Sequence, residues 1–189
     1  MGFIDRDLPS HRTYVALLRG INVGGHRRIA MADLRELMRS LGHPDAITHL
    51  QSGNIVFDSA GKEVAKVRGE LEAAIASRLG LEVRVLIRTR AELVRIIEAN
   101  PLPAAAAEPS RLMVTFLDPS PTEEQVASVD PSEFLPDELR FGDGVAYAWY
   151  HEGIQASKLT DAVWSRRLGV LATTRNWRTV TWLAGAGGM

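Results

Sequence analysis

Three glycines, one asparagine and three arginines lie within ten residues near the N-terminus, in the stretch RGINVGGHRR from Arg19 to Arg28. Glycines permit backbone conformations closed to other residues and let amide hydrogens approach a ligand closely. Arginine side chains supply forked donors that suit phosphate or carboxylate groups. The stretch therefore predicts a cradle for an anion, and a tight connection with exposed arginines is the structural alternative. The candidate ligand-binding residues of this loop are Arg19, Gly20, Asn22, Gly24, Gly25 and Arg27.

Other signatures of chemistry are missing from the sequence. The glycine spacing matches neither the G-x-x-x-x-G-K-[ST] nor the G-x-G-x-x-G phosphate-binding motif. The chain has no cysteine, and its five histidines show no ligand spacing with one another or with carboxylates, so no metal site is predicted. No G-x-S-x-G elbow marks a nucleophile. The sequence identifies no catalytic residue and no cofactor, and it leaves open whether the chain is an enzyme.

Two further stretches, and one lysine, offer polar groups for a site. The run Ser52-Gly53-Asn54 is typical of a tight hairpin turn. Near the C-terminus, Thr173 and Thr174 precede a predicted first helical turn that would present two polar residues beside an aromatic ring, although Trp177 is more often a core residue. Ser157-Lys158 fits a phosphate contact no better than an N-cap followed by a solvated lysine. The further candidate ligand-binding residues are Ser52, Asn54, Lys158, Arg175, Asn176 and Trp177.

The elements that must position these residues follow the order β-α-β-β-α-β, which is that of a ferredoxin-like sheet. The run Thr13–Arg19 is apolar on both faces, as in a central strand covered on both sides. Leu34, Leu37, Met38 and Leu41 recur at helical spacing after the glycine loop. Strands are predicted over 13–19, 46–51, 54–59 and 81–88, and helices over 31–41 and 64–79.

The second half of the chain repeats this pattern without a detectable sequence repeat. A third helix begins at Thr89 and Glu92, and three prolines mark residues 100–110 as a linker. A strand over 111–117, a short helix capped by Thr122 and Gln125, a hairpin over 138–150 and a helix over 157–169 follow. A final helix over 174–185 stands where the last strand would come.

The fold class is therefore predicted as α+β, with two ferredoxin-like halves packed together. The first half spans 13–99, residues 100–110 form a Pro/Ala linker, and the second half spans 111–185 with its extra terminal helix. Such a sheet carries helices on one face only, so its other face needs cover if Val15, Leu17 and Leu86 are to leave water. That pairing would leave a groove between the halves, a common place for ligands.

The charge and composition of the chain limit the classes of partner that the sequence predicts. The net charge of −1 predicts neither a nucleic-acid nor a membrane partner from the whole-molecule field. Residues 101–152 carry ten acidic and two basic residues, whereas residues 153–189 carry one acidic and five basic residues. Neither a signal peptide nor an apolar run of about 18 residues occurs, so a cytoplasmic protein is expected.

The same stretches resemble a known family. LLRGINVGG followed by MADLRELMRSLG, then LQSGNIVF and TTRNWRTVTWL, are similar to family 1697 of the domains of unknown function, from about Thr13 to Leu183. The resemblance implies a two-part α/β protein whose halves are similar to ferredoxin-like plaits, and it implies no activity. Many members carry GGK where this chain has His26-Arg27-Arg28, which keeps positive charge but loses the ammonium group. The matched positions are Arg19, Gly20, Asn22, Gly24, Gly25, Gln51, Ser52, Gly53, Asn54, Ser157, Lys158, Thr174, Arg175, Asn176 and Trp177.

Three functions remain open from the sequence. The favoured hypothesis is that loop 19–28, joined in the folded chain by Arg175 and Asn176, holds a phosphate-bearing, nucleotide-like small molecule. By fold analogy with acylphosphatases, the alternative is a phosphoryl or acyl-phosphate hydrolase or transferase in which Asn54 positions water. A further alternative is a protein-interaction module that offers the acidic segment 118–143 to a basic partner. Nucleic acid is disfavoured because Tyr14 and Phe57 are the only rings on the strands that would stack bases.

Overall fold

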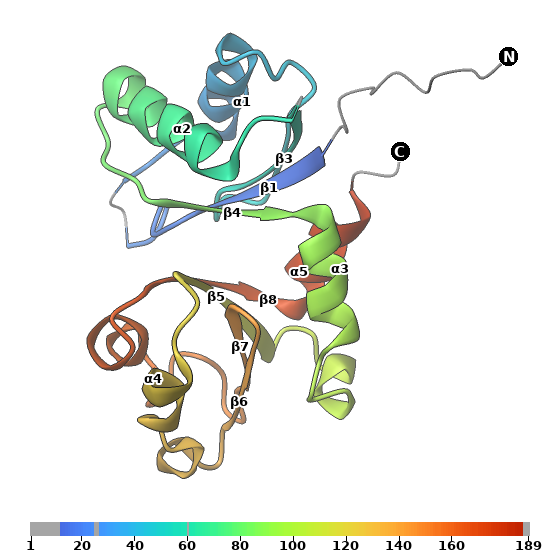
Figure 1. Cartoon of the computed structure of the whole chain (residues 1–189), viewed down its shortest axis with the longest axis vertical. Coiled ribbons are helices and arrows are strands. Elements are labelled where there is room, and N and C mark those ends of the chain that lie inside the picture. Colours follow the sequence, from blue (N-terminus) through green and yellow to red (C-terminus); the bar gives the residue numbers. More distant parts are fainter. Residues whose placement is uncertain (1–11, 25–26, 60, 187–189) are drawn as a thin grey trace, which may run out of the picture. The chain divides into compact units, whose positions relative to one another are not determined.

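The computed structural model describes residues 12–24, 27–59 and 61–186. The chain divides into two compact units, residues 1–90 and 91–189 (Figure 1). Each unit contains one four-stranded antiparallel sheet together with helices, which confirms the α+β class. Gly25 and His26 of the glycine-rich loop lie outside the described residues.

The first unit has the predicted element order β-α-β-β-α-β. Its elements are β1 (Arg12–Leu18), α1 (Met31–Ser40), β2 (Ile47–His49), β3 (Asn54–Ser59), α2 (Val64–Leu79) and β4 (Val85–Thr89). The strand order is β2-β3-β1-β4, so β1 pairs antiparallel with both β3 and β4. This arrangement brings the loop that follows β1 to the same end of the sheet as the turn that precedes β3, because β1 and β3 run in opposite directions.

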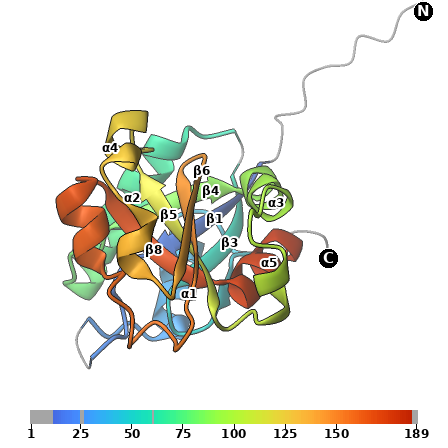
Figure 2. The same ribbon diagram turned by 90° about the horizontal axis from the view of Figure 1, so that it is seen from below.

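Helices α1 and α2 cover one face of the first sheet (Figures 1 and 2). Because side chains alternate along a strand, Tyr14, Ala16 and Leu18 of β1 point into this helix-covered core. The apolar stripes of the helices complete it at helical spacing. The buried helix residues are Leu34, Leu37 and Met38 of α1 and Val67, Leu71 and Ile75 of α2.

The second unit has the same relative strand order as the first, β6-β7-β5-β8. Its strands and helices are α3 (Arg90–Glu98), β5 (Leu112–Asp118), α4 (Glu123–Ala127), β6 (Glu138–Gly142), β7 (Val145–Trp149), β8 (Leu171–Asn176) and α5 (Trp177–Gly185). Short 3₁₀ turns cover Ala104–Ala107 and Pro131–Phe134, and a π-helical turn covers Val163–Arg167. Thr122 and Gln125 form the predicted capping box at the start of α4.

Three features of the second unit differ from the sequence expectation. The final helix begins at Trp177, because Leu171–Asn176 is a strand that pairs with β5 and completes the second sheet. The predicted helix over 157–169 is reduced to the turn Val163–Arg167 and the residues just before it. Helix α3 belongs almost entirely to the second unit, since the Tyr147 hydroxyl of β7 donates to the Ile96 carbonyl at 2.7 Å.

Candidate functional site

The Asn22 side chain ties the glycine-rich loop to the β2–β3 turn. Its Nδ2 donates to the Ile29 carbonyl at 3.0 Å and to the Gln51 carbonyl at 2.7 Å, while its Oδ1 accepts from the Ile29 amide at 2.9 Å. Asn22 adopts a left-handed backbone conformation, with φ of 56°. The structure therefore brings together two stretches that are about 29 residues apart in sequence. The polar atoms of the Asn22 side chain thus form hydrogen bonds within the protein, and the role of Asn22 toward a ligand stays a prediction.

Gly53 packs the turn against the loop. Its φ is +76°, its carbonyl accepts from the Leu18 amide at 2.8 Å, and the residue is buried. A methyl group on Gly53 would lie 2.5 Å from Ile21 Cδ1 and 2.8 Å from Leu18 Cβ. Only glycine therefore fits between the turn and the end of β1.

Asn54 braces the turn from inside the protein. The residue is completely buried, and its Nδ2 donates to the His49 carbonyl at 2.7 Å and to Ser52 Oγ at 3.1 Å. Both amide hydrogens of Asn54 are thus donated within the protein, and its role toward a water molecule stays a prediction.

Two backbone amides of the loop also donate hydrogen bonds within the protein. The Arg19 amide donates to the Arg84 carbonyl at 2.9 Å, and the Asn22 amide donates to the Arg27 carbonyl at 3.1 Å. The Arg27 guanidinium lies over Gly20, because a Cβ at Gly20 would be 3.6 Å from Arg27 Nη1. These two hydrogen bonds tie the described ends of the loop to the protein, and of its arginines Arg27 and Arg28 are exposed while Arg19 is half-buried.

A cavity of about 410 Å³ opens where the loop enters α1. Helix α1 has Ala30 as its N-cap, and this residue offers no side-chain acceptor to the amides of the first turn. Arg28 lies exposed at the cavity wall, whereas the acidic Asp33 stands in the first turn. The cavity is lined by Asn22, Arg28, Ile29, Ala30 and Gln51.

The C-terminal candidates are placed in the second unit. Arg175 is only 7% exposed, and its Nη1 donates to Thr173 Oγ1 and to the Thr174 carbonyl, each at 2.9 Å. Burial lowers the pKa of Arg175 to about 10. Asn176 Oδ1 caps α5 by accepting from the Thr179 amide at 2.9 Å and from its hydroxyl at 2.8 Å. Trp177 is buried.

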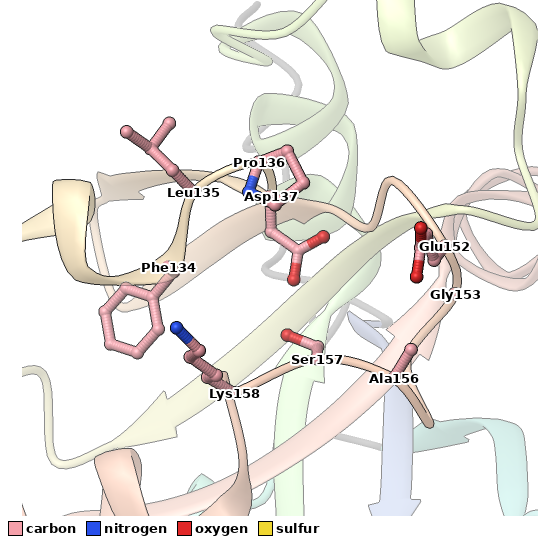
Figure 3. A pocket seen from close by; sticks show the side chains of 9 residues that line it. All are labelled: Phe134, Leu135, Pro136, Asp137, Glu152, Gly153, Ala156, Ser157 and Lys158. Carbon is pink, nitrogen blue, oxygen red and sulfur yellow. The ribbon is translucent and has the colours of Figure 1, made fainter.

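Lys158 lines a separate, smaller cavity of about 140 Å³ in the second unit (Figure 3). Its other polar lining residues are Asp137, Glu152 and Ser157. Asp137 belongs to the acidic segment 118–143 but is only 7% exposed, and its Oδ1 accepts from the His151 amide at 2.8 Å. In the sequence, the burial of Asp137 is indicated only by its position between the apolar run Phe134–Pro136 and Leu139.

Nucleic-acid binding and the acidic interaction surface each depend on side chains that the structure shows to be buried or already paired. Tyr14 and Phe57 lie in the core of the first unit, so neither ring is free to stack a base. Within the acidic segment, Glu133 forms a two-pronged ion pair with Arg167, at 3.1 and 2.7 Å. In the described part of the chain, no group of three or more histidines or acidic residues is placed to hold a metal ion.

Comparison with known proteins places this chain in a family. The model of a family described as a protein of unknown function, DUF1697, matches residues 12–147. This match includes the glycine-rich loop and the β2–β3 turn. The chain belongs to the DUF1697 family. No curated protein matches this DUF1697 chain at a significant level.

One solved structure similar to this DUF1697 protein is a conserved bacterial protein, SP0830, from Streptococcus pneumoniae. The two share 24% sequence identity and a TM-score of 0.74, over 93% of this chain and 98% of that one. At this identity the likeness concerns the fold. Among the described residues, no helix is long and apolar enough to cross a membrane.

Proposed function

We propose that this DUF1697 protein binds a phosphate-bearing, nucleotide-like ligand in the cavity between the glycine-rich loop and the start of α1. The observation that carries the proposal is the combination of Arg28, the uncapped first turn of α1 and a cavity of about 410 Å³. Each unit is a ferredoxin-like plait in this proposal, which the shared strand orders β2-β3-β1-β4 and β6-β7-β5-β8 support.

The physical basis is the excess of hydrogen-bond donors at this end of α1. First-turn amides without a capping acceptor attract anions, and the helix dipole adds to the attraction. Arg28 can add a forked, charge-assisted pair of hydrogen bonds, each contributing about 1.5–3 kcal/mol. Three such bonds support roughly millimolar to micromolar binding once association costs are subtracted. The hydrogen bonds of Asn22 hold this wall in place before the ligand arrives.

Substituting Arg28 tests the proposal. Titration with inorganic phosphate, pyrophosphate and a nucleoside triphosphate should raise the melting temperature, by several degrees when the ligand exceeds its Kd about a hundredfold. Arg28→Ala should weaken the affinity by about tenfold or more in calorimetry, because one charge-assisted contact is lost. Arg78→Ala, an exposed arginine at the end of α2, removes the same charge and should bind normally. Equal affinities in both variants, or no response to any phosphate compound, would refute the site.

A second substitution is expected to raise the affinity for phosphate instead of lowering it. Asp33 in the first turn of α1 competes electrostatically with a bound anion, so Asp33→Asn should strengthen phosphate binding about two- to fivefold. The same change removes a favourable charge–dipole contact and should lower the stability of the free protein by about 0.3–1 kcal/mol. Calorimetry and urea denaturation measure the two effects. The exposed Asp45→Asn has the same charge change, and a matching gain in affinity there would mean a nonspecific charge effect.

A further inference from the structure

The smaller cavity of the second unit contains a buried carboxylate that the proposed phosphate site does not use. Asp137 lies between the 3₁₀ turn Pro131–Phe134 and β6, and it is more than nine-tenths buried. Its Oδ1 accepts from the His151 amide at 2.8 Å, and its second oxygen has no hydrogen-bond donor among the described residues. Burial, and after it the nearby Asp137 charge, raises the pKa of Tyr150 well above its usual range.

Two hydrogen-bond donors, the Ser157 hydroxyl and the Lys158 ammonium group, lie across the cavity from the Asp137 carboxylate. Ser157 Oγ accepts from the Leu159 amide at 2.9 Å, which fixes the hydroxyl and leaves its hydrogen free to donate. Lys158 is exposed at the mouth and forms no ion pair with the described residues. Figure 3 shows the Asp137 carboxylate and the Ser157 hydroxyl pointing toward one another, with the Lys158 ammonium group beside the Phe134 ring.

This arrangement favours a ligand that carries one positively charged and one negatively charged group. The second oxygen of Asp137 has no donor from the described residues and is not among their buried unpartnered atoms, so it is open to a cation that enters the cavity and donates to it. Across the cavity, the Ser157 hydroxyl and the Lys158 ammonium are donors that suit a carboxylate. Phe134, Pro136 and Ala156 contribute apolar surface to the lining, and Glu152 adds a second carboxylate that favours the positive end of such a ligand.

We propose that this cavity binds a small zwitterion of the α-amino-acid class, with its ammonium group on Asp137 and its carboxylate on Ser157 and Lys158. The cavity volume of about 140 Å³ admits only a short side chain, which would lie against the apolar surface of the lining. The proposal goes beyond phosphate binding, because it concerns different residues in a different unit.

Two backbone amides report on the two ends of the cavity. The His151 amide donates to Asp137 and the Leu159 amide donates to Ser157, so NMR shifts of these two signals follow each end separately. Titration of the full chain with L-alanine should shift both signals with one saturation curve. Ethylamine, which has only the ammonium group, should shift His151 alone and bind at least tenfold more weakly. Propionate should shift Leu159 alone, also weakly. If ethylamine binds as tightly as L-alanine, or L-alanine shifts neither signal, the proposal is overturned.

Variants test the same assignment. Asp137→Asn keeps an acceptor for the His151 amide and removes the buried charge, so it should abolish the L-alanine response while the melting temperature stays equal or rises. A large fall in melting temperature would instead assign Asp137 a structural role and overturn the proposal. Lys158→Ala should fold normally and weaken L-alanine, but not ethylamine, by about tenfold. Asp143→Asn in the β6–β7 turn is the matched control and should bind L-alanine normally. Unchanged L-alanine binding in Lys158→Ala would also overturn the assignment.

Discussion

Replacing Gly53 by alanine is expected to destabilise the protein by about 2–5 kcal/mol. The left-handed conformation of Gly53, with φ of +76°, costs a residue with a Cβ about 1–2 kcal/mol. The added methyl would also lie 2.5 Å from Ile21 Cδ1 and 2.8 Å from Leu18 Cβ, and overpacking of this kind typically costs 1–3 kcal/mol. Urea denaturation followed by far-UV circular dichroism measures the loss.

Gly80 is a matched control that separates the conformational cost of an added Cβ from its packing cost. Gly80 caps α2 with φ of +65°, and a Cβ there would meet nothing within 4 Å. Gly80→Ala should therefore cost only the conformational part, about 1–2 kcal/mol. Equal losses for Gly53→Ala and Gly80→Ala would show that the turn yields to the extra methyl. All four tryptophans, at positions 149, 164, 177 and 182, lie in the second unit, so amide hydrogen exchange of β1 and β3 should report the Gly53 effect more directly than tryptophan fluorescence.

Asn22→Ala should cost about 2–4 kcal/mol and should weaken phosphate binding at the same time. Three hydrogen bonds between the loop, Ile29 and Gln51 are lost, each contributing about 0.5–1.5 kcal/mol, and the left-handed φ of 56° becomes less favourable. Without this brace, the loop no longer holds the wall of the cavity that Arg28 lines. Urea denaturation and phosphate calorimetry on the same samples measure both losses.

Two companion variants identify the cause. Asn22→Gly removes the side chain but tolerates the left-handed backbone, so it should recover the conformational part of the loss and leave the hydrogen-bond part. Asn22→Asp keeps the acceptor for the Ile29 amide but places a carboxylate oxygen against the Ile29 and Gln51 carbonyls, so it should be no more stable than alanine. Wild-type stability in Asn22→Ala would contradict the bracing role.

Periodicity was sufficient to predict most of the first unit from sequence. Apolar residues at helical spacing predict α1 and α2, because this pattern reports burial of one helix face. In β4 the consecutive residues Val85, Leu86 and Ile87 are all buried, as in a strand covered on both faces. The missed strand β8 has a different cause. Its run Leu171–Asn176 contains Thr173 and Thr174, which suit a strand as well as a helix start, and only pairing with β5 decides between them.

The candidate site was predictable in its pieces but not in its contacts. Sequence patterns singled out the glycine loop and the hairpin turn separately, whereas the Asn22–Gln51 hydrogen bond depends on how the sheet brings them together. For the same reason, Asn54 looked available for a ligand until the fold showed it donating to His49 and Ser52. Asp137 lies in the acidic segment 118–143, and its burial comes from residues distant along the chain, which the local sequence pattern does not report.

The central position of β1 also bears on how the chain folds as it leaves the ribosome. Strand β1 lies between β3 and β4, so the first sheet cannot close until Val85–Thr89 has emerged. Strand β5 lies in the same way between β7 and β8, and it waits for Leu171–Asn176. At about 5–20 residues per second, the nearly 100 residues of the second unit take roughly 5–20 s to synthesise. The nascent first unit therefore has time to fold, while β5 stays without its β8 neighbour, with unpaired backbone groups along that edge, until synthesis is nearly finished.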